Sequence, residues 1–281
     1  MIHTSKQLKD KVRNLSKGDN DIAKALIRTF MMERFLERVS LSKYRENIIL
    51  KGGMLVASIV GTNLRATMDI DTTVKALPLN TSEMEKVVDE IAAVPVEDGV
   101  TFQIKSITTI MDDFDYPGVR IVLEATLEKM RQSLKLDIST DDIITPSAVG
   151  YEYKLMFEDR TIHLLTYNVE TLLAEKIQTI LARGIANTRM RDFFDIYEIT
   201  KRGKIDIHTL QAAFLATCKK RETLFSESEM NNILRKISED DIMAQMWERF
   251  RKKNYFVGEL QWEEVSGEVI SNIQEFVVEK P

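Results

Sequence analysis

The sequence is poor in the residues that build disulfides and zinc sites. It contains one cysteine, Cys218, so no disulfide can form within the chain, and we expect a protein of the reducing cytoplasm. Its three histidines, His3, His163 and His208, lie far apart in sequence and lack the spacing of metal ligands. These absences exclude a disulfide-stabilised scaffold and argue against a zinc site.

Long apolar runs and an excess of positive charge are also missing. No segment is apolar for the length of a membrane span, and the first residues lack the apolar core of a signal peptide, so we expect no membrane partner. The net charge is −5, so any nucleic-acid contact would have to use local basic clusters. With 281 residues, of which 44% are hydrophobic and 30% charged, the chain can form one large or two modest globular domains.

Hydrophobic patterning predicts an α+β fold. Two helices are expected first, and the following helices at 54–60 and 81–92 alternate with strands at 48–50 and 68–75. Further strand-like runs lie at 101–110, 119–127, 133–139, 151–157 and 161–165. A polar turn at 112–118 makes the first two of these runs an antiparallel hairpin. We therefore predict a mixed or antiparallel sheet with helices in residues 1–166, followed by a mainly helical C-terminal domain in residues 167–281.

The stretch from Ile48 to Val74 carries the clearest functional signal. Side chains alternate between the two faces of a strand, so Asp69 and Asp71 share one face while Met68 and Ile70 are expected to point into the core. Asp-x-Asp is common in exposed loops. In a half-buried strand, however, a paired acid needs a positive partner, and two carboxylates on one face suit a hard cation such as Mg²⁺.

Two glycines precede the helix of this stretch. Gly52 and Gly53 have no Cβ, so the turn after the first strand can bring backbone N–H groups close to a phosphate at the helix N-terminus. A tight turn without a ligand is the commoner use of such a pair. Strand alternation does not decide whether Lys51, just before them, assists or points away.

A third acid lies in the strand expected at 133–139. Asp137 shares a face with Lys135 and Ser139, opposite the apolar residues of the strand. Alone it would be an edge charge. Beside Asp69 and Asp71 it becomes a candidate third carboxylate, either completing a metal site or accepting a proton from an attacking hydroxyl.

Charged residues in the helical half allow two interpretations. Lys176 and Arg183 share one helix face, and Asp192 and Asp195 share a face of the next helix. They form either an interhelix salt-bridge set or a substrate contact. The basic clusters at 219–221 and 249–253 are typical of solvated helix ends, with contact to RNA as the alternative.

Four motifs in this order resemble the AbiEii family of nucleotidyltransferase toxins, in the DNA polymerase β-type nucleotidyltransferase superfamily. Residues 51–53 and 65–71 are similar to the family's glycine turn and Arg-x-Thr/Ser-x-Asp-x-Asp strand, and Asp137 corresponds to its second motif. Residues 176–183 and 192–197 are similar to Lys-Ile/Leu-x-Ala-x-x-x-Arg and Asp-Phe/Val-x-Asp-Leu/Ile-Tyr/Trp. This sequence departs from the pattern at Gly53, where members often have serine, and at Thr179, where alanine is usual.

The resemblance implies metal-dependent transfer of a nucleotide from an NTP, with release of pyrophosphate. Asp69, Asp71 and Asp137 would hold Mg²⁺ or Mn²⁺, and Lys176 would bind the nucleotide phosphates during catalysis. The implied nucleotide-binding residues are Lys51, Gly52, Gly53, Arg65, Thr67, Arg183, Asp192 and Asp195. The helical domain would complete the substrate cleft.

The same resemblance implies a toxin of a toxin–antitoxin or phage abortive-infection system. Its partners would be an NTP, a tRNA or other RNA acceptor, and a cognate AbiEi-like antitoxin. Two alternatives stay open: a non-catalytic module that binds an NTP or a partner on the same fold, and an antibiotic nucleotidyltransferase. The second would need an acidic pocket for its aminoglycoside acceptor.

Overall fold

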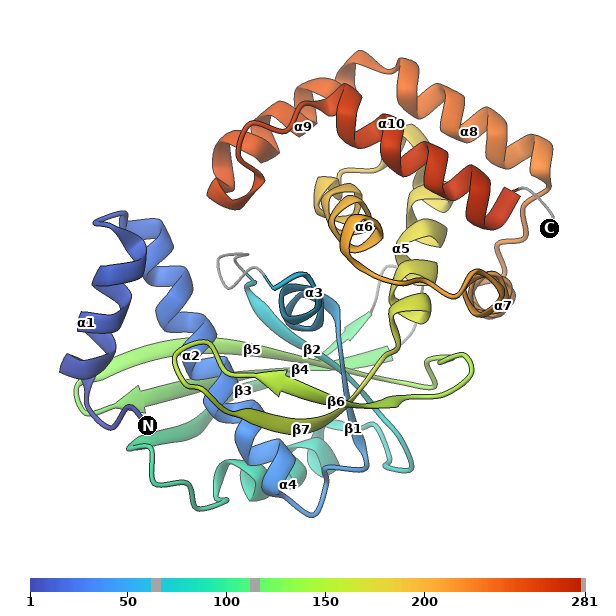
Figure 1. The fold of residues 1–281 in the computed structure, drawn as a ribbon. Coiled ribbons are helices and arrows are strands. Elements are labelled where there is room, and N and C mark those ends of the chain that lie inside the picture. The colour runs from blue at the N-terminus through green and yellow to red at the C-terminus, as the bar shows by residue number, and fades with distance from the viewer. Residues whose placement is uncertain (62–66, 112–116, 279–281) are drawn as a thin grey trace. The chain divides into compact units, whose positions relative to one another are not determined.

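The chain forms two compact units in a computed structural model that describes residues 1–61, 67–111 and 117–278 (Figure 1). Residues 1–142 and 148–166 make up the first, which we call the sheet unit. Residues 143–147 and 167–281 make up the second, which we call the helical unit.

The sheet unit begins with two capped helices. Helix α1 (Ser5–Ser16) starts at a capping box, in which Thr4 accepts a hydrogen bond from the Gln7 backbone N–H and the Gln7 side chain accepts one in return. Asp19 caps α2 (Asn20–Leu41) by accepting hydrogen bonds from the first backbone N–H groups of the helix. The long second helix is buried over most of its C-terminal half, as expected of a helix packed on a sheet.

Seven strands form one mixed sheet in the order β3-β4-β5-β2-β1-β7-β6. Their bounds are β1 Ile48–Lys51, β2 Asp69–Val74, β3 Val100–Met111, β4 Pro117–Leu127, β5 Met130–Thr140, β6 Val149–Lys154 and β7 Thr161–Thr166. Strands β2 and β5 are parallel, as are β1 and β7, and the other neighbours are antiparallel. The predicted α+β fold and the predicted β3–β4 hairpin are confirmed, although residues 112–116 of its turn lie outside the described part of the chain.

The centre of the sheet buries one face and presents acids on the other. Ile70 of β2 and Leu136 of β5 are buried, and their neighbours Asp71 and Asp137 point to the opposite face. The prediction that Met68 also points into the core was wrong. Strand β2 begins only at Asp69, so Met68 lies before the strand and does not follow its alternation of faces. Its side chain is 51% exposed.

Two helices complete the sheet unit. Helix α3 (Gly52–Val60) follows β1 directly and starts at the glycine pair, two residues before the predicted start at Met54. The glycines therefore belong to the first turn of the helix rather than to a separate turn before it. Helix α4 (Thr81–Ala92) starts at the N-cap Asn80, rather than at the expected cap Thr81 or Ser82, and ends at Ala92 as predicted.

The helical unit consists of α-helices connected by short segments. Their bounds are α5 Val169–Arg183, α6 Met190–Arg202, α7 Ile207–Lys220, α8 Glu227–Glu239, α9 Asp241–Lys253 and α10 Trp262–Ile273. Asn168 caps α5 by accepting a hydrogen bond from the Thr171 N–H. Across the described ranges, no helix combines the length and apolarity needed to cross a membrane.

Candidate active site

Three carboxylates meet on the polar face of the sheet. Asp71 and Asp137 are direct neighbours on the parallel strands β2 and β5, and Asp69 lies two residues before Asp71 on the same face. One carboxylate oxygen from each of the three lies within 4.8 Å of the others, and all three residues are half-buried. The structure thus brings together the three acids that the strand patterns nominated.

Asp71 lies in an environment that disfavours its charged form. Burial, and then repulsion from Asp69, raises its pKa from 3.8 to about 6, against the opposing effects of Lys51 and the Gly53 N–H. Oxygen atoms that repel one another in a half-buried site fit a divalent cation, which binds oxygen ligands and neutralises them. The donor set therefore fits a hard metal ion held by Asp69, Asp71 and Asp137.

The glycine pair gives Asp71 its space. Gly52 has a φ of +63°, and a Cβ placed there would lie 2.1 Å from Oδ2 of Asp71. The next amide, the N–H of Gly53, donates a hydrogen bond to the same oxygen at 3.3 Å. The first turn of α3 and the carboxylate thus fit together only because residue 52 lacks a side chain.

Lys51 points toward a fourth acid that sequence reasoning missed. Its Nζ lies 2.5 Å from Oδ2 of Asp142, which also accepts a hydrogen bond from the Ser139 hydroxyl at 2.8 Å. Lys51 pairs across the sheet with Asp71 and lowers the pKa of that carboxyl. Asp142 follows the end of β5, and no local pattern singled it out.

Arg120 of β4 holds the third carboxylate. Its Nε and Nη2 each donate to one oxygen of Asp137 at 2.7 Å, a bidentate pair. This partner was also missed, although the β4–β5 hairpin contains the signal. Leu127 pairs with Met130 across a two-residue turn. Arg120 lies seven residues before Leu127 and Asp137 lies seven residues after Met130, so the hairpin places the two opposite each other.

Replacing Arg120 tests whether this pair positions the acid. Arg120→Lys keeps the positive charge but loses the two-pronged geometry, so we expect transfer activity to fall about 10–100-fold, as for other residues that orient metal ligands. Activity should be measured at saturating Mg²⁺, with the melting temperature as a check on folding. Arg131→Lys, on the neighbouring strand with an exposed side chain, is the matched control. Equal activity in the two variants would contradict a positioning role.

Lys176 joins two buried acids within the helical unit. Its Nζ lies 2.8 Å from Oδ1 of Asp192 and 2.8 Å from Oδ2 of Asp195, and the two acid side chains are only 3% and 1% exposed. Arg189 forms a further ion pair with Asp192 at 2.8 Å. Of the two interpretations, the salt-bridge set describes what these three residues do in the structure, and a substrate role for them stays a prediction.

Lys176→Met is therefore expected to destabilise the protein. Removing one partner of a buried ion pair leaves uncompensated charge, which typically costs about 3–5 kcal/mol. Chemical denaturation monitored by circular dichroism measures this loss, and Lys204→Met, in the segment between α6 and α7, is the control. A variant as stable as the wild type, with a raised KM for the NTP, would instead make nucleotide binding the main role of Lys176.

The remaining predicted residues are only partly located by the structure. Arg65 lies outside the described residues. Thr67 is buried, and its hydroxyl donates to the Asp69 carbonyl at 3.3 Å, while Arg183 ends α5 half-buried. Their contacts with nucleotide stay predictions.

The basic clusters are largely engaged within the helical unit. Arg221 donates to the side-chain oxygen of Gln178 at 2.6 Å, and Arg251 pairs with Glu248 and Glu259. Lysines of both clusters lie in the last turns of α7 and α9, where the helix dipole favours positive charge. These contacts favour the interpretation of the clusters as helix ends.

Two solved structures that are similar to this chain come from one bacterial species. A candidate nucleotidyltransferase from H. pylori is 17% identical, with a TM-score of 0.52 over 90% of this chain and 94% of that one. The protein JHP933 from Helicobacter pylori gives the same identity, TM-score and coverage of this chain, and 91% of its own chain is covered. At this identity the two structures show the fold. A search of curated proteins gave no match.

A family model matches the sequence over residues 34–266, well over half of the chain, and it describes the nucleotidyl transferase AbiEii toxin of a type IV toxin–antitoxin system. The match runs through α2, the acid-bearing strands and the helical unit as far as α10. Membership implies a nucleotide substrate and an antitoxin partner. The chain is therefore a nucleotidyltransferase and belongs to the AbiEii family of toxins.

Proposed function

We propose that this enzyme transfers a nucleotide from an NTP to a cellular RNA, with tRNA as the first acceptor to test, and releases pyrophosphate. The observation that carries the proposal is the cluster of Asp69, Asp71 and Asp137 beside the first turn of α3. Mg²⁺ or Mn²⁺ held there would neutralise the triphosphate and the charge that develops on the leaving pyrophosphate.

Each neighbouring residue has a role in this proposal. The amino end of α3 favours the negative charge of the β- and γ-phosphates, and Lys51 adds a positive charge beside Asp71. Both oxygens of Asp137 accept N–H donors from Arg120, which holds this carboxylate in place and favours the role of metal ligand. The acceptor hydroxyl then loses its proton to another group or to water.

The experiment is a labelling reaction with the purified full-length protein and Mg²⁺. Each of the four α-³²P NTPs is supplied in turn, with total cellular RNA in one arm and an aminoglycoside in another. We expect label in an RNA band with one or a few of the NTPs, and none in the presence of EDTA or with Asp69→Asn. Label in the aminoglycoside alone would replace RNA by the drug as acceptor.

Labelling that persists in folded Asp69→Asn would remove the acids from the reaction. Absence of label in either acceptor, with protein that melts cooperatively, would contradict the proposed substrate class. A further arm with Glu46→Gln, an exposed acid before β1, controls for the loss of one negative charge.

A further inference from the structure

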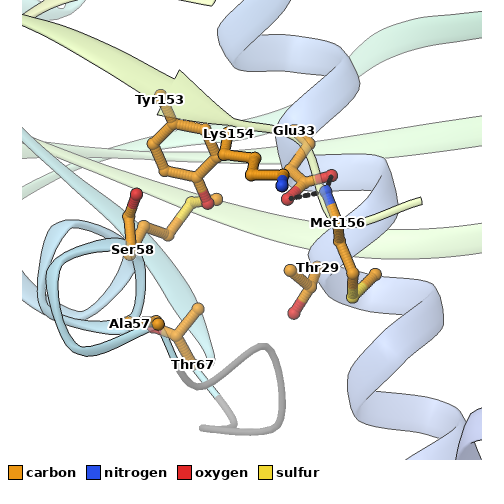
Figure 2. A pocket seen from close by; sticks show the side chains of 10 residues that line it. Thr29, Glu33, Ala57, Ser58, Thr67, Tyr153, Lys154 and Met156 are labelled. Atoms are coloured by element: carbon orange, nitrogen blue, oxygen red, sulfur yellow. Dashed lines mark hydrogen bonds between the residues drawn. The ribbon is translucent and has the colours of Figure 1, made fainter. Parts of the chain in front are cut away.

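The sheet unit contains a cavity that has no role in the function proposed above. It measures about 240 Å³ and lies between α2, α3 and the segment from Tyr153 to Met156 (Figure 2). A single buried water needs only about 10–15 Å³ of such space, whereas drug-sized ligands occupy about 300–1,000 Å³. The cavity therefore has the size for a small ring system.

Hydroxyl groups line this cavity from two sides. Tyr153 is 3% exposed, and in the described part of the chain its hydroxyl forms no hydrogen bond. Burial raises its pKa well above 10, so the hydroxyl stays protonated and can donate a hydrogen bond. The Thr29 hydroxyl lines the opposite, α2 side, also without a partner among the described residues. Thr29 is half-buried and Tyr153 is buried, and a ligand or water in the cavity can hydrogen-bond with both hydroxyls.

Glu33 of α2 supplies a second donor. It is 2% exposed, and both of its carboxyl oxygens accept the same Met156 N–H, at 3.1 Å. Burial is the largest effect on this group and raises its pKa to about 8. The hydrogen bond from the Met156 N–H and the charge of Arg34 lower this pKa, whereas Glu158 and Glu37 raise it. At neutral pH the group is a carboxylic acid, which presents an O–H donor and a C=O acceptor side by side.

The chemistry of this lining selects against other ligands. An anion would meet the acid Glu33, and among the described lining residues the exposed Lys154 is the only cation. An alkyl chain would leave the hydroxyls of Tyr153 and Thr29 unpaired. Met54 and Met156 supply thioethers, which pack well against flat aromatic rings. A neutral planar ligand with a donor and an acceptor on one edge matches every group.

We propose that this cavity binds the nucleobase of a substrate, with its ring between the methionines Met54 and Met156 and its hydrogen-bonding edge toward Glu33 and Tyr153. The base belongs either to the NTP or to a nucleotide of the RNA acceptor. The choice between these two substrates rests on the proposed function. All four common bases carry adjacent donor and acceptor atoms on one edge, so the lining recognises a base without selecting one.

The cavity is connected to the acids through two elements. Helix α3 places Gly52 against Asp71 at its start and Ser58 in the cavity wall six residues later, about 9 Å along the helix axis. Thr67 also lines the cavity and donates a hydrogen bond to the backbone of Asp69. A base held in the cavity would thus contact the helix that packs against Asp71 and the residue bonded to the backbone of Asp69.

The test uses nucleosides, which have no phosphate and so need neither metal nor the α3 N-terminus. Adenosine, guanosine, cytidine and uridine are titrated by calorimetry into the full-length protein in EDTA. We expect binding to the wild type and to Asp69→Asn, at least about 10-fold weaker binding to Tyr153→Phe, and none to Ala57→Phe, whose ring fills the cavity. Tyr44→Phe, at a half-buried tyrosine whose hydroxyl donates to Glu90, should bind as the wild type.

Steady-state kinetics then assign the source of the base. A raised KM for the NTP in Tyr153→Phe assigns the cavity to the NTP, and a raised KM for RNA assigns it to the acceptor. Nucleoside binding that does not depend on Tyr153 overturns the cavity assignment and leaves the proposed function intact. The same holds if the wild type transfers label but binds no nucleoside. Binding through Tyr153 in a protein that transfers no label keeps it and contradicts the proposed function instead.

Discussion

Asp71→Asn is expected to abolish nucleotide transfer and, at the same time, to stabilise the metal-free protein. The loss of one carboxylate from the metal-binding set removes several kcal/mol of transition-state stabilisation, which corresponds to about 10³-fold in rate or more. The gain in stability comes from the removal of a buried charge that Asp69 and Asp137 repel. We expect about 1–3 kcal/mol, or about 2–4 °C in Tm for each kcal/mol.

This gain should depend on pH with a definite sign. The pKa of Asp71 is about 6 in the folded protein, above the ordinary value of 3.8, so the folded state holds this proton more tightly than the unfolded chain. Protonated Asp71 therefore makes a favourable contribution to the free energy of unfolding, which is complete below about pH 4 and is lost as the pH rises to about 6. The variant should therefore melt near the wild type at pH 4 and above it at pH 7.

Mg²⁺ separates the two effects of this substitution. The ion should raise the Tm of the wild type, because it binds the folded state, and should leave the Tm of Asp71→Asn nearly unchanged. Asp159→Asn, at a fully exposed position, controls for the loss of a charge. A variant that is less stable than the wild type at pH 7 without metal, or one that still transfers label, would contradict the view of Asp71 as a strained metal ligand.

Strand periodicity was enough to find the acids. Asp69, Asp71 and Asp137 alternate with apolar residues, and a period of two leaves only one face for them once Ile70 and Leu136 are buried. Met68 shows the limit of the same rule, because periodicity does not say where the strand begins. The fold class followed from the same patterns.

Among the partners of the acids, only Arg120 lies close enough in sequence to be found from a local pattern, the hairpin of β4 and β5. Arg120 meets Asp137 only because β4 and β5 pair in one register, and Asp142 meets Lys51 across 91 positions of sequence. Glu33 lies in a helix whose apolar face suggested core packing, and its burial depends on the segment around Met156, more than 100 positions away. Pairing over such separations is decided by the whole sheet, so a single sequence carries little of it.

The reason for the glycine pair was also only partly predictable. Sequence reasoning connected Gly52 to a phosphate, whereas in the structure its missing side chain makes room for Asp71. The two roles agree in one respect: both need the backbone of the first α3 turn to come close to a charged oxygen. Which oxygen comes closest depends on the β1–β2 register, in which Lys51 lies opposite Asp71.

Gly52→Ala is consequently expected to remove both activity and stability. An alanine at a φ of +63° is strained by about 1–2 kcal/mol, and its Cβ, 2.1 Å from Oδ2 of Asp71, forces that carboxylate to move. With overpacking included, we expect a loss of about 2–5 kcal/mol and a fall in activity close to that of Asp71→Asn. Gly18→Ala has a φ of +89° and nothing within 4 Å of its Cβ, so it should show the backbone strain alone.

A double-mutant cycle distinguishes the steric clash between the new Cβ and Asp71 from the backbone strain at the positive φ of residue 52, because only the clash involves Asp71. If the carboxylate and the new methyl group compete for one space, Gly52→Ala should destabilise the Asp71→Gly background by no more than the Gly18→Ala control, since the collision is gone there. The coupling energy measured by urea denaturation would then be about 1–3 kcal/mol in favour of the double variant. Additive effects would mean that Gly52 is required for its φ alone, and that the position of Asp71 does not depend on the glycine.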